Sequence, residues 1–188
     1  MIFRSGLALL SLCLLASCAA SLKAHGTIVD QPAPELGLRS SQRAPFLLSD
    51  QRGNEVILFF GYTHCGDICP ETLAHVARAL ELIGVSKEPI QTVFISVDPS
   101  RDTPVVADRY AQRFSARFIG LSGSPRQLAG VERAYHVWSK TMPPDRMGNY
   151  EVAHSSQIFL IAPNGHLRII EDWDIPVPQL AEDIRALQ

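Results

Sequence analysis

Short apolar runs alternate along the chain with segments whose apolar residues recur at helical spacing. Residues 55–61 (EVILFFG) and 92–97 (TVFISV) are rich in β-forming side chains, a pattern typical of strands buried on both faces. Residues 70–84 carry an apolar side chain every three or four positions, which predicts a helix with one face on a core. We expect this helix to begin at Pro70 and to stop at Gly84.

The second half of the chain continues the alternation. Thr103-Pro104 and Ser124-Pro125 each place a capping residue before a proline, which predicts two more helix starts. The dipeptide Asn164-Gly165 predicts a hairpin turn between two strands. Residues 138–153 show no clear period, so we expect a loop that can end in a strand. The other predicted elements are strands at 118–121, 157–161 and 166–170 and a closing helix at 177–187.

The order of these elements predicts the fold class. Strands that alternate with helices favour an α/β sheet with right-handed crossovers. A strand that leads into a cysteine-bearing helix start, followed late in the chain by an antiparallel hairpin, is the plan of a thioredoxin. We therefore expect an α/β, thioredoxin-like fold with a central mixed sheet flanked by helices, with insertions and an N-terminal extension.

Composition narrows the function classes. The 188 residues allow one domain, and 46% apolar against 19% charged residues is an ordinary globular balance. The formal net charge of -2 offers no basic face for nucleic acid, so no nucleic-acid partner is expected.

The first residues resemble an export signal. Arg4 precedes an apolar run from Gly6 to Leu15, which has the length of a signal-peptide core. The run ends in Leu-Ala-Ser-Cys at Cys18, which looks like a bacterial lipobox. Residues 1–17 are then a lipoprotein signal peptide, and Cys18 is the first mature residue and the lipid acceptor. Ordinary secretion with cleavage near Ala20 or Ala24, or an uncleaved anchor, are the alternatives.

This interpretation sets the domain boundaries and the location. Residues 18–30 are predicted to be a tether, and residues 31–188 are predicted to be the thioredoxin-like domain. The protein is expected in the bacterial cell envelope, exported and held on the membrane by the lipid, facing the periplasm or the outer side.

Only two cysteines then remain in the folded domain, Cys65 and Cys69. A disulfide between residues so close in sequence closes a tiny loop and stabilises little, so the pair is expected to serve chemistry. Pro70 places Cys69 at or just outside a helix start, where the helix dipole favours thiolates. Thiolates attack disulfides and also bind soft metal ions such as Cu(I), and the CxxxC motif alone does not decide between these uses.

A third ligand is available in His154, just ahead of the strand expected at 157–161. In a thioredoxin plan the loop before this strand faces the cysteine-bearing helix. Redox members of that class usually have a cis-proline there, whereas no proline stands between Pro144 and Pro163. An imidazole in this place completes a set of two sulfurs and one nitrogen that suits copper.

Three blocks carry a resemblance to a known family. They are FFGYTHCGDICPETL (59–73), SVDPSRDTP (96–104) and YEVAHSSQIFLIAPNG (150–165), and in this order and spacing they are similar to the Sco/SenC family. The resemblance implies copper, as Cu(I) or Cu(II), bound by Cys65, Cys69 and His154. It also implies that copper or electrons reach the binuclear copper centre of a cytochrome c oxidase. The expected partners are the copper-bearing oxidase subunit and a thiol reductant or copper donor.

Two positions depart from the family pattern, and other functions stay open. Gly66 replaces a frequent proline, and Ala153 replaces the usual aspartate before the histidine, which removes a carboxylate that could orient His154. The main alternative is an envelope thiol–disulfide oxidoreductase that uses Cys65 and Cys69 without stable metal binding. A peroxidase ranks third, because Thr63 is present but no arginine can be placed in the site from sequence. A conventional enzyme is not expected.

Overall fold

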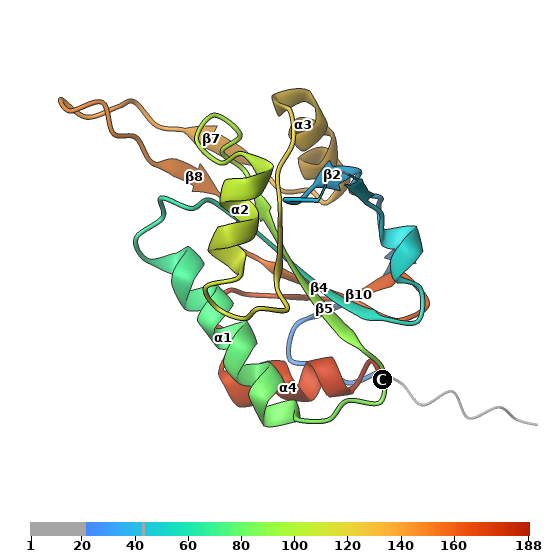
Figure 1. Cartoon of the computed structure of the whole chain (residues 1–188). Coiled ribbons are helices and arrows are strands. Elements are labelled where there is room, and N and C mark those ends of the chain that lie inside the picture. The colour runs from blue at the N-terminus through green and yellow to red at the C-terminus, as the bar shows by residue number, and fades with distance from the viewer. Residues whose placement is uncertain (1–21, 43) are drawn as a thin grey trace, which may run out of the picture.

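A six-stranded mixed sheet runs through the centre of the molecule, in the order β1-β10-β9-β4-β5-β6 (Figure 1). Strands β4, β5 and β6 are parallel, and β9, β10 and β1 extend the sheet on the other side of β4 as antiparallel neighbours. The strands are β1 (Thr27–Pro32), β4 (Glu55–Gly61), β5 (Ile90–Ser96), β6 (Ile119–Leu121), β9 (Ile158–Ile161) and β10 (His166–Glu171). All seven residues of β4 are buried, as its unbroken apolar run predicts.

This computed structural model describes residues 22–42 and 44–188. The expected signal peptide at 1–17 and the expected lipid acceptor Cys18 lie outside the described residues. Within the described part, no helix is both long enough and apolar enough to cross a membrane.

Helices cover both faces of the sheet. On one face, the rings of Phe59, Phe94 and Tyr110 pack in series, which places α2 against β4 and β5. On the other face, the ring of Tyr135 packs against Phe60 and Phe159, which places the end of α3 there. Helix α4 lies beside α1 (Figure 1). The helices are α1 (Ile68–Ile83), α2 (Pro104–Ala111), α3 (Pro125–Ala134) and α4 (Val177–Arg185).

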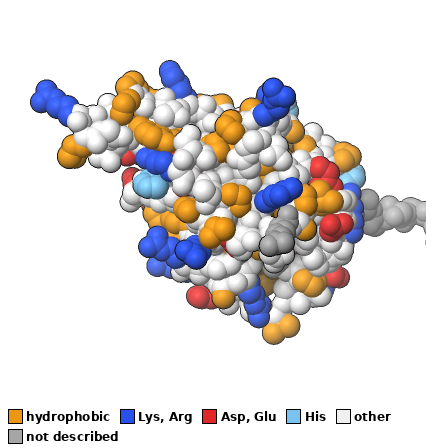
Figure 2. Space-filling model, turned by 45° about the horizontal axis from the view of Figure 1, so that its top comes forward, with side chains coloured by type: hydrophobic (Ala, Val, Ile, Leu, Met, Phe, Trp, Pro, Cys, Tyr) orange, Lys and Arg blue, Asp and Glu red, His pale blue; other side chains and the backbone are white. Residues whose placement is uncertain are grey.

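Two small sheets and a short 3-10 helix are added to this plan. Strands β2 (Leu38–Arg39) and β3 (Pro45–Phe46) pair before the 3-10 helix at Leu48–Gln51. Strands β7 (Ser139–Thr141) and β8 (Val152–His154) form a hairpin that projects from the body. Figure 2 shows apolar and basic side chains together on a projecting part of the surface. These additions are the insertions expected on a thioredoxin-like fold.

The predicted helix starts at Thr103 and Ser124 are confirmed. The side chain of Thr103 accepts a hydrogen bond from the Val106 N–H at 3.3 Å. Ser124 and Gln127 form a capping box, in which each side chain accepts a hydrogen bond from the other residue's backbone N–H.

Most predicted bounds shift by one or two residues, and three differences bear on the site or on the domain limits. Helix α1 begins at Ile68, two residues before Pro70, because the missing N–H of a proline costs nothing within the first turn. Strand β7 lies in the segment predicted as loop, since its pairing with β8 depends on contacts distant in sequence. Strand β1 begins at Thr27, so the range 18–30 predicted as tether includes the first residues of the main sheet.

Candidate metal centre

The candidate centre lies where the parallel strands β4 and β5 end. Their last residues, Gly61 and Ser96, are register partners, so the loops that follow leave the sheet side by side. The loop after Gly61 carries Cys65 into helix α1, and the loop after Ser96 leads to α2. The carboxyl ends of parallel strands are a common position for binding sites in α/β sheets.

The two cysteines are free thiols in contact at the start of α1. Cys69 is fully buried, and Cys65 is half-buried. The backbone N–H of Cys69 donates to the sulfur of Cys65 at 3.4 Å. The Asp67 side chain makes no capping hydrogen bond, so the Cys65 sulfur serves a first-turn N–H of the helix instead.

This contact separates the acidities of the two thiols. A hydrogen bond from the Cys69 thiol lowers the pKa of Cys65 to about 5, although partial burial opposes the shift. The same hydrogen bond, together with burial, raises the pKa of Cys69 above its usual value. Cys65 is therefore the thiolate of the pair at neutral pH, and Cys69 is the protonated donor.

His154 faces this pair from β8. Its Nε2 atom lies 3.7 Å from the sulfur of Cys69, and its Nδ1 atom lies 2.9 Å from the carbonyl oxygen of Val152. A carbonyl only accepts, so Nδ1 carries the hydrogen of this bond, and Nε2 presents its lone pair in the neutral ring. The ring also packs edge-on against Tyr62, with centroids 5.6 Å apart.

The carbonyl of Val152 orients the His154 ring, which is the role expected of a carboxylate at residue 153. Ala153 lacks any group that could orient an imidazole, but a backbone acceptor two residues before His154 fixes both the ring and its tautomer. The family pattern does not indicate this hydrogen bond, because every residue type at position 152 has a backbone carbonyl.

The distances support the predicted ligand set in part. A sulfur and an imidazole nitrogen bound to one ion at about 2.3 and 2.0 Å stand about 3.5 Å apart at a tetrahedral angle. The separation of 3.7 Å between Cys69 and His154 is close to this value. Across residues 22–42 and 44–188, no group of three or more His, Cys, Asp or Glu side chains is arranged to hold a metal ion. The three-residue site of Cys65, Cys69 and His154 therefore stays a prediction.

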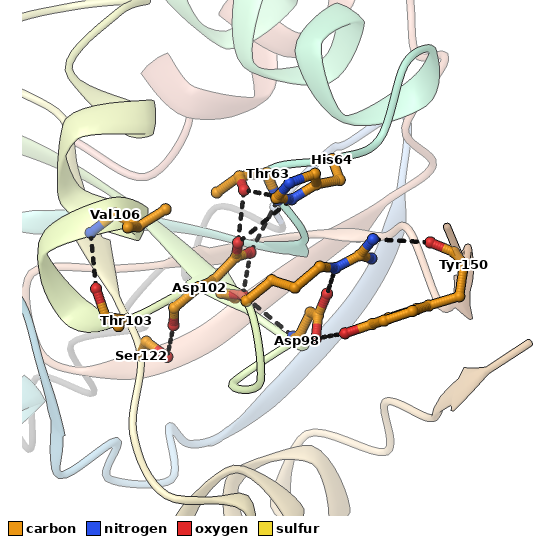
Figure 3. Close-up of polar contacts among 10 residues, drawn as sticks. Thr63, His64, Asp98, Asp102, Thr103, Val106, Ser122 and Tyr150 are labelled. Atoms are coloured by element: carbon orange, nitrogen blue, oxygen red, sulfur yellow. Dashed lines mark hydrogen bonds and ion pairs between the residues drawn. The ribbon is translucent and has the colours of Figure 1, made fainter. Parts of the chain in front are cut away.

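A frame of polar side chains lies beside the loop that carries the cysteines, and sequence reasoning missed most of it; Figure 3 shows part of this frame. Asp102, which is fully buried, accepts hydrogen bonds from the Thr63 N–H at 2.9 Å and from the Thr63 hydroxyl at 2.5 Å. His64 lies beside this carboxylate at 3.8 Å and is half-exposed, as expected for a loop histidine. The block SVDPSRDTP marked this loop as distinctive, but nothing in it indicated the contact with Thr63.

The frame also contains an arginine. Arg101 pairs with Asp98 through Nε at 2.5 Å and donates from Nη1 to the Tyr150 carbonyl at 2.9 Å. Asp98, which follows the end of β5, therefore holds an ion pair. The Thr63 hydroxyl donates to Asp102, and Arg101 is engaged in this ion pair.

The fold and this site define a class of protein: a thioredoxin-like domain whose reduced cysteine pair faces a histidine. The sequence pattern of the SCO1/SenC family matches residues 38–188, and the chain belongs to that family.

Known relatives agree with this assignment. The chain is 46% identical over 120 residues to the Bos taurus mitochondrial protein SCO2 homolog, covering 62% of this chain and 45% of the relative. It is 36% identical over 140 residues to a putative copper-binding protein of Stutzerimonas stutzeri, covering 74% of this chain and 68% of the relative. The chain spans about half the length of the mammalian SCO2 relatives from cattle and humans.

Solved structures are similar over most of the fold. Apo Sco1 of Thermus thermophilus has a TM-score of 0.78 at 34% identity, covering 90% of this chain and 99% of that chain. ScoI of Arabidopsis thaliana with copper bound has a TM-score of 0.75 at 31% identity, covering 82% of this chain and 99% of that chain. The thioredoxin-like architecture predicted from the sequence is confirmed.

Proposed function

We propose that this protein is a copper-binding assembly factor that holds one copper ion through Cys65, Cys69 and His154 and supplies copper or electrons to a cytochrome c oxidase. The observation that carries the proposal is the approach of the His154 Nε2 atom to the Cys69 sulfur at 3.7 Å. Relatives with copper bound, from Arabidopsis thaliana and Bradyrhizobium japonicum, support copper as the metal.

The chemistry of the donors fits this cargo. Two thiolates and a neutral imidazole suit a soft ion such as Cu(I), and thiols must lose their protons before they bind it. Cys65 already has a pKa of about 5, so one sulfur is ready at neutral pH. Cys69 gives up its proton when it binds, and the Cys65 sulfur must turn from the Cys69 amide toward the shared ion.

Copper binding and thiol oxidation exclude one another at this pair. Oxidation of the Cys65 thiolate and the Cys69 thiol to a disulfide releases two electrons and one proton, and disulfide sulfurs are poor ligands. The protein must therefore be kept reduced by a thiol partner in an oxidising compartment.

The ligand set is tested by Cu(I) titration of the reduced protein against a chromogenic Cu(I) chelator. The wild type is expected to bind about one ion per chain, and His154→Ala to weaken binding at least about tenfold. His166→Ala, at the turn between β9 and β10, is the matched control and is expected to bind like the wild type. An unchanged affinity in His154→Ala would remove the histidine from the site.

The second candidate function is thiol–disulfide exchange without stable copper binding. It is favoured by the thiolate at Cys65, which is half-buried and lies beside the Cys69 donor. This function predicts turnover of a disulfide substrate that is indifferent to His154. Measuring both activities on the same His154→Ala sample separates the two candidates.

Location and anchoring complete the proposal. The Leu-Ala-Ser-Cys run at Cys18 supports a lipid-modified N-terminus that holds the domain at a bacterial envelope membrane, close to a membrane-bound oxidase. Expression of the full chain, fractionation and mass spectrometry of the N-terminal peptide test this. Cys18→Ala is expected to abolish the lipid mass, and a lipid-free wild-type protein would overturn it.

A further inference from the structure

The turn between β5 and α2, residues Asp98–Asp102, contacts both the loop that carries the cysteines and the hairpin that carries His154. It is a tight structure in itself, because the N–H groups of Arg101 and Asp102 both donate to the Asp98 carbonyl, at 3.2 and 2.9 Å. The Asp98 N–H in turn donates to the Ser96 hydroxyl at 3.1 Å, which fixes the turn to the end of β5. The side chains of two adjacent residues of the turn then contact different segments: Arg101 donates to the Tyr150 carbonyl, and Asp102 accepts from the Thr63 N–H.

Asp102 reaches the cysteine loop. Its buried carboxylate accepts three hydrogen bonds, two from Thr63 and one from the Ser96 hydroxyl at 2.6 Å. Thr63 stands two residues before Cys65. The carboxylate therefore fixes the chain at the point where it leaves β4 for the two sulfurs, and charge-assisted bonds of this kind are among the stronger ones.

Arg101 reaches the histidine hairpin. Its guanidinium lies 3.6 Å from the centroid of the Tyr150 ring and donates to the Tyr150 carbonyl, while the Tyr150 hydroxyl donates to Asp98 at 3.0 Å. Tyr150 stands four residues before His154, at the base of the strand that carries the imidazole. The stacked and bonded arginine thus holds that strand at a fixed distance from the turn.

We propose that the turn Asp98–Asp102 sets the separation between the sulfurs and the imidazole, with Asp102 positioning the cysteine loop and Arg101 positioning the histidine strand. Neither side chain is placed as a ligand. The claim for Arg101 (the Arg101 half of the proposal) rests on the proposed copper function. The claim for Asp102 (the Asp102 half) is tested by a measurement that needs no copper.

The Asp102 half is tested by the dithiol–disulfide equilibrium of Cys65 and Cys69 in glutathione buffers. Asp102→Asn loosens the loop and lowers the effective concentration of one sulfur near the other, so the disulfide is expected to become less stable by at least about threefold. Asp108→Asn is the matched control. Asp108 in α2 is also buried and bonds to backbone N–H groups, but these belong to Ser41 and Gly120 and not to the cysteine loop.

A shift in Asp102→Asn no larger than that in Asp108→Asn overturns the Asp102 half. Where Asp102→Asn fails to fold by circular dichroism, Thr63→Val is measured instead. This variant keeps the Thr63 N–H and the side-chain shape but removes the hydroxyl donor, and a smaller shift in the same direction is expected. An unshifted equilibrium in folded Thr63→Val then overturns the claim.

The Arg101 half is tested by the Cu(I) affinity of Arg101→Lys, which keeps the charge but loses the planar donors. Affinity is expected to fall about three- to tenfold, while the dithiol–disulfide equilibrium stays at the wild-type value. Arg168→Lys on β10 is the control and is expected to change neither quantity.

The outcomes separate this inference from the proposed function. If His154→Ala weakens copper binding and Arg101→Lys does not, the Arg101 half is wrong and the ligand set stands. If His154→Ala has no effect, the ligand set and the Arg101 half fall together, and the Asp102 result still decides its own half.

Discussion

The sulfur of Cys69 packs against the backbone of Gly61, so closely that a Cβ atom on residue 61 would lie 2.9 Å from it. The same Cβ would also lie 3.0 Å from the rings of Phe59 and Phe94. The last residue of β4 therefore limits where the second cysteine can sit, and a glycine there keeps the space for its sulfur.

Gly61→Ala is expected to displace the Cys69 sulfur and to lower the free energy of unfolding by about 1–3 kcal/mol. The reason is that the sulfur and the rings of Phe59 and Phe94 cannot all move away from the added methyl group. Copper affinity should fall with it. Gly66→Ala is the control, since nothing lies within 4 Å of a Cβ at residue 66. Urea denaturation and Cu(I) titration of both variants check this, and equal behaviour of the two would contradict it.

Cys65 should react with iodoacetamide well before Cys69. Its pKa of about 5 means that the thiolate is nearly fully formed above pH 6, so the alkylation rate should level off there and not climb toward pH 9. Cys69 is buried and its pKa is raised, so it should react only after unfolding. Peptide mass spectrometry after brief labelling from pH 4 to 9 measures both rates. Preferential labelling of Cys69 would refute the assignment.

The contribution of Glu55 to stability should fall as the pH rises from about 5 to 8, while the lowered pKa of Cys65 acts in the opposite direction. Burial raises the pKa of Glu55 to about 8, and the contact with the Gln188 side chain opposes this shift only in part. The folded state therefore keeps a proton that the unfolded state loses near pH 4.5. This contribution is fully present below that pH and is lost as the pH rises toward 8, with a magnitude on the order of 3 kcal/mol.

Glu55→Gln should flatten this dependence and raise stability at pH 8, as urea denaturation at pH 5 and pH 8 would show. Some slope should remain, because burial also raises the pKa of Glu171 to about 8, beside Asp183. Glu81→Gln, an exposed change in α1, is the control. If Glu55→Gln gained no more stability relative to the wild type at pH 8 than at pH 5, the sign assigned to Glu55 would be wrong.

Ser124→Ala should remove the capping box of α3 and lower the free energy of unfolding by about 1 kcal/mol. Because α3 lies away from the cysteines, the Cu(I) affinity should stay at the wild-type value. Thermal denaturation and copper titration of one sample check both statements. A loss of copper affinity without a loss of stability would be inconsistent with a role confined to the cap.

Local sequence signals were sufficient for the main elements. The apolar run of β4 was predicted with its observed bounds, and Thr103 and Ser124 cap helices as expected. These features depend on neighbours in sequence. Helix α1 begins earlier than predicted because a proline is tolerated throughout the first turn, and the restriction that Pro70 imposes on Cys69 is only a preference.

Residue types and their spacing indicated the candidate ligands, but they did not indicate the groups that hold these residues in place. Residue type and order placed Cys65, Cys69 and His154 together, and the structure brings the last two within 3.7 Å. The Val152 carbonyl, the Thr63 contact of Asp102 and the stacking of Arg101 on Tyr150 join residues far apart in sequence, or use backbone atoms. Such contacts are set by tertiary packing, which a pattern of residue types does not contain.

Strand β1 has a practical consequence for how the domain can be cut. It pairs with β10 from Thr27 to Pro32 and so occupies the hydrogen-bonding groups along that side of the sheet. A recombinant fragment that starts at residue 31 loses most of this strand and presents the vacated groups of β10 to solvent. Exposed edges of this kind recruit strands from other molecules, so the shortened fragment should self-associate at concentrations where a chain starting before Thr27 remains monodisperse.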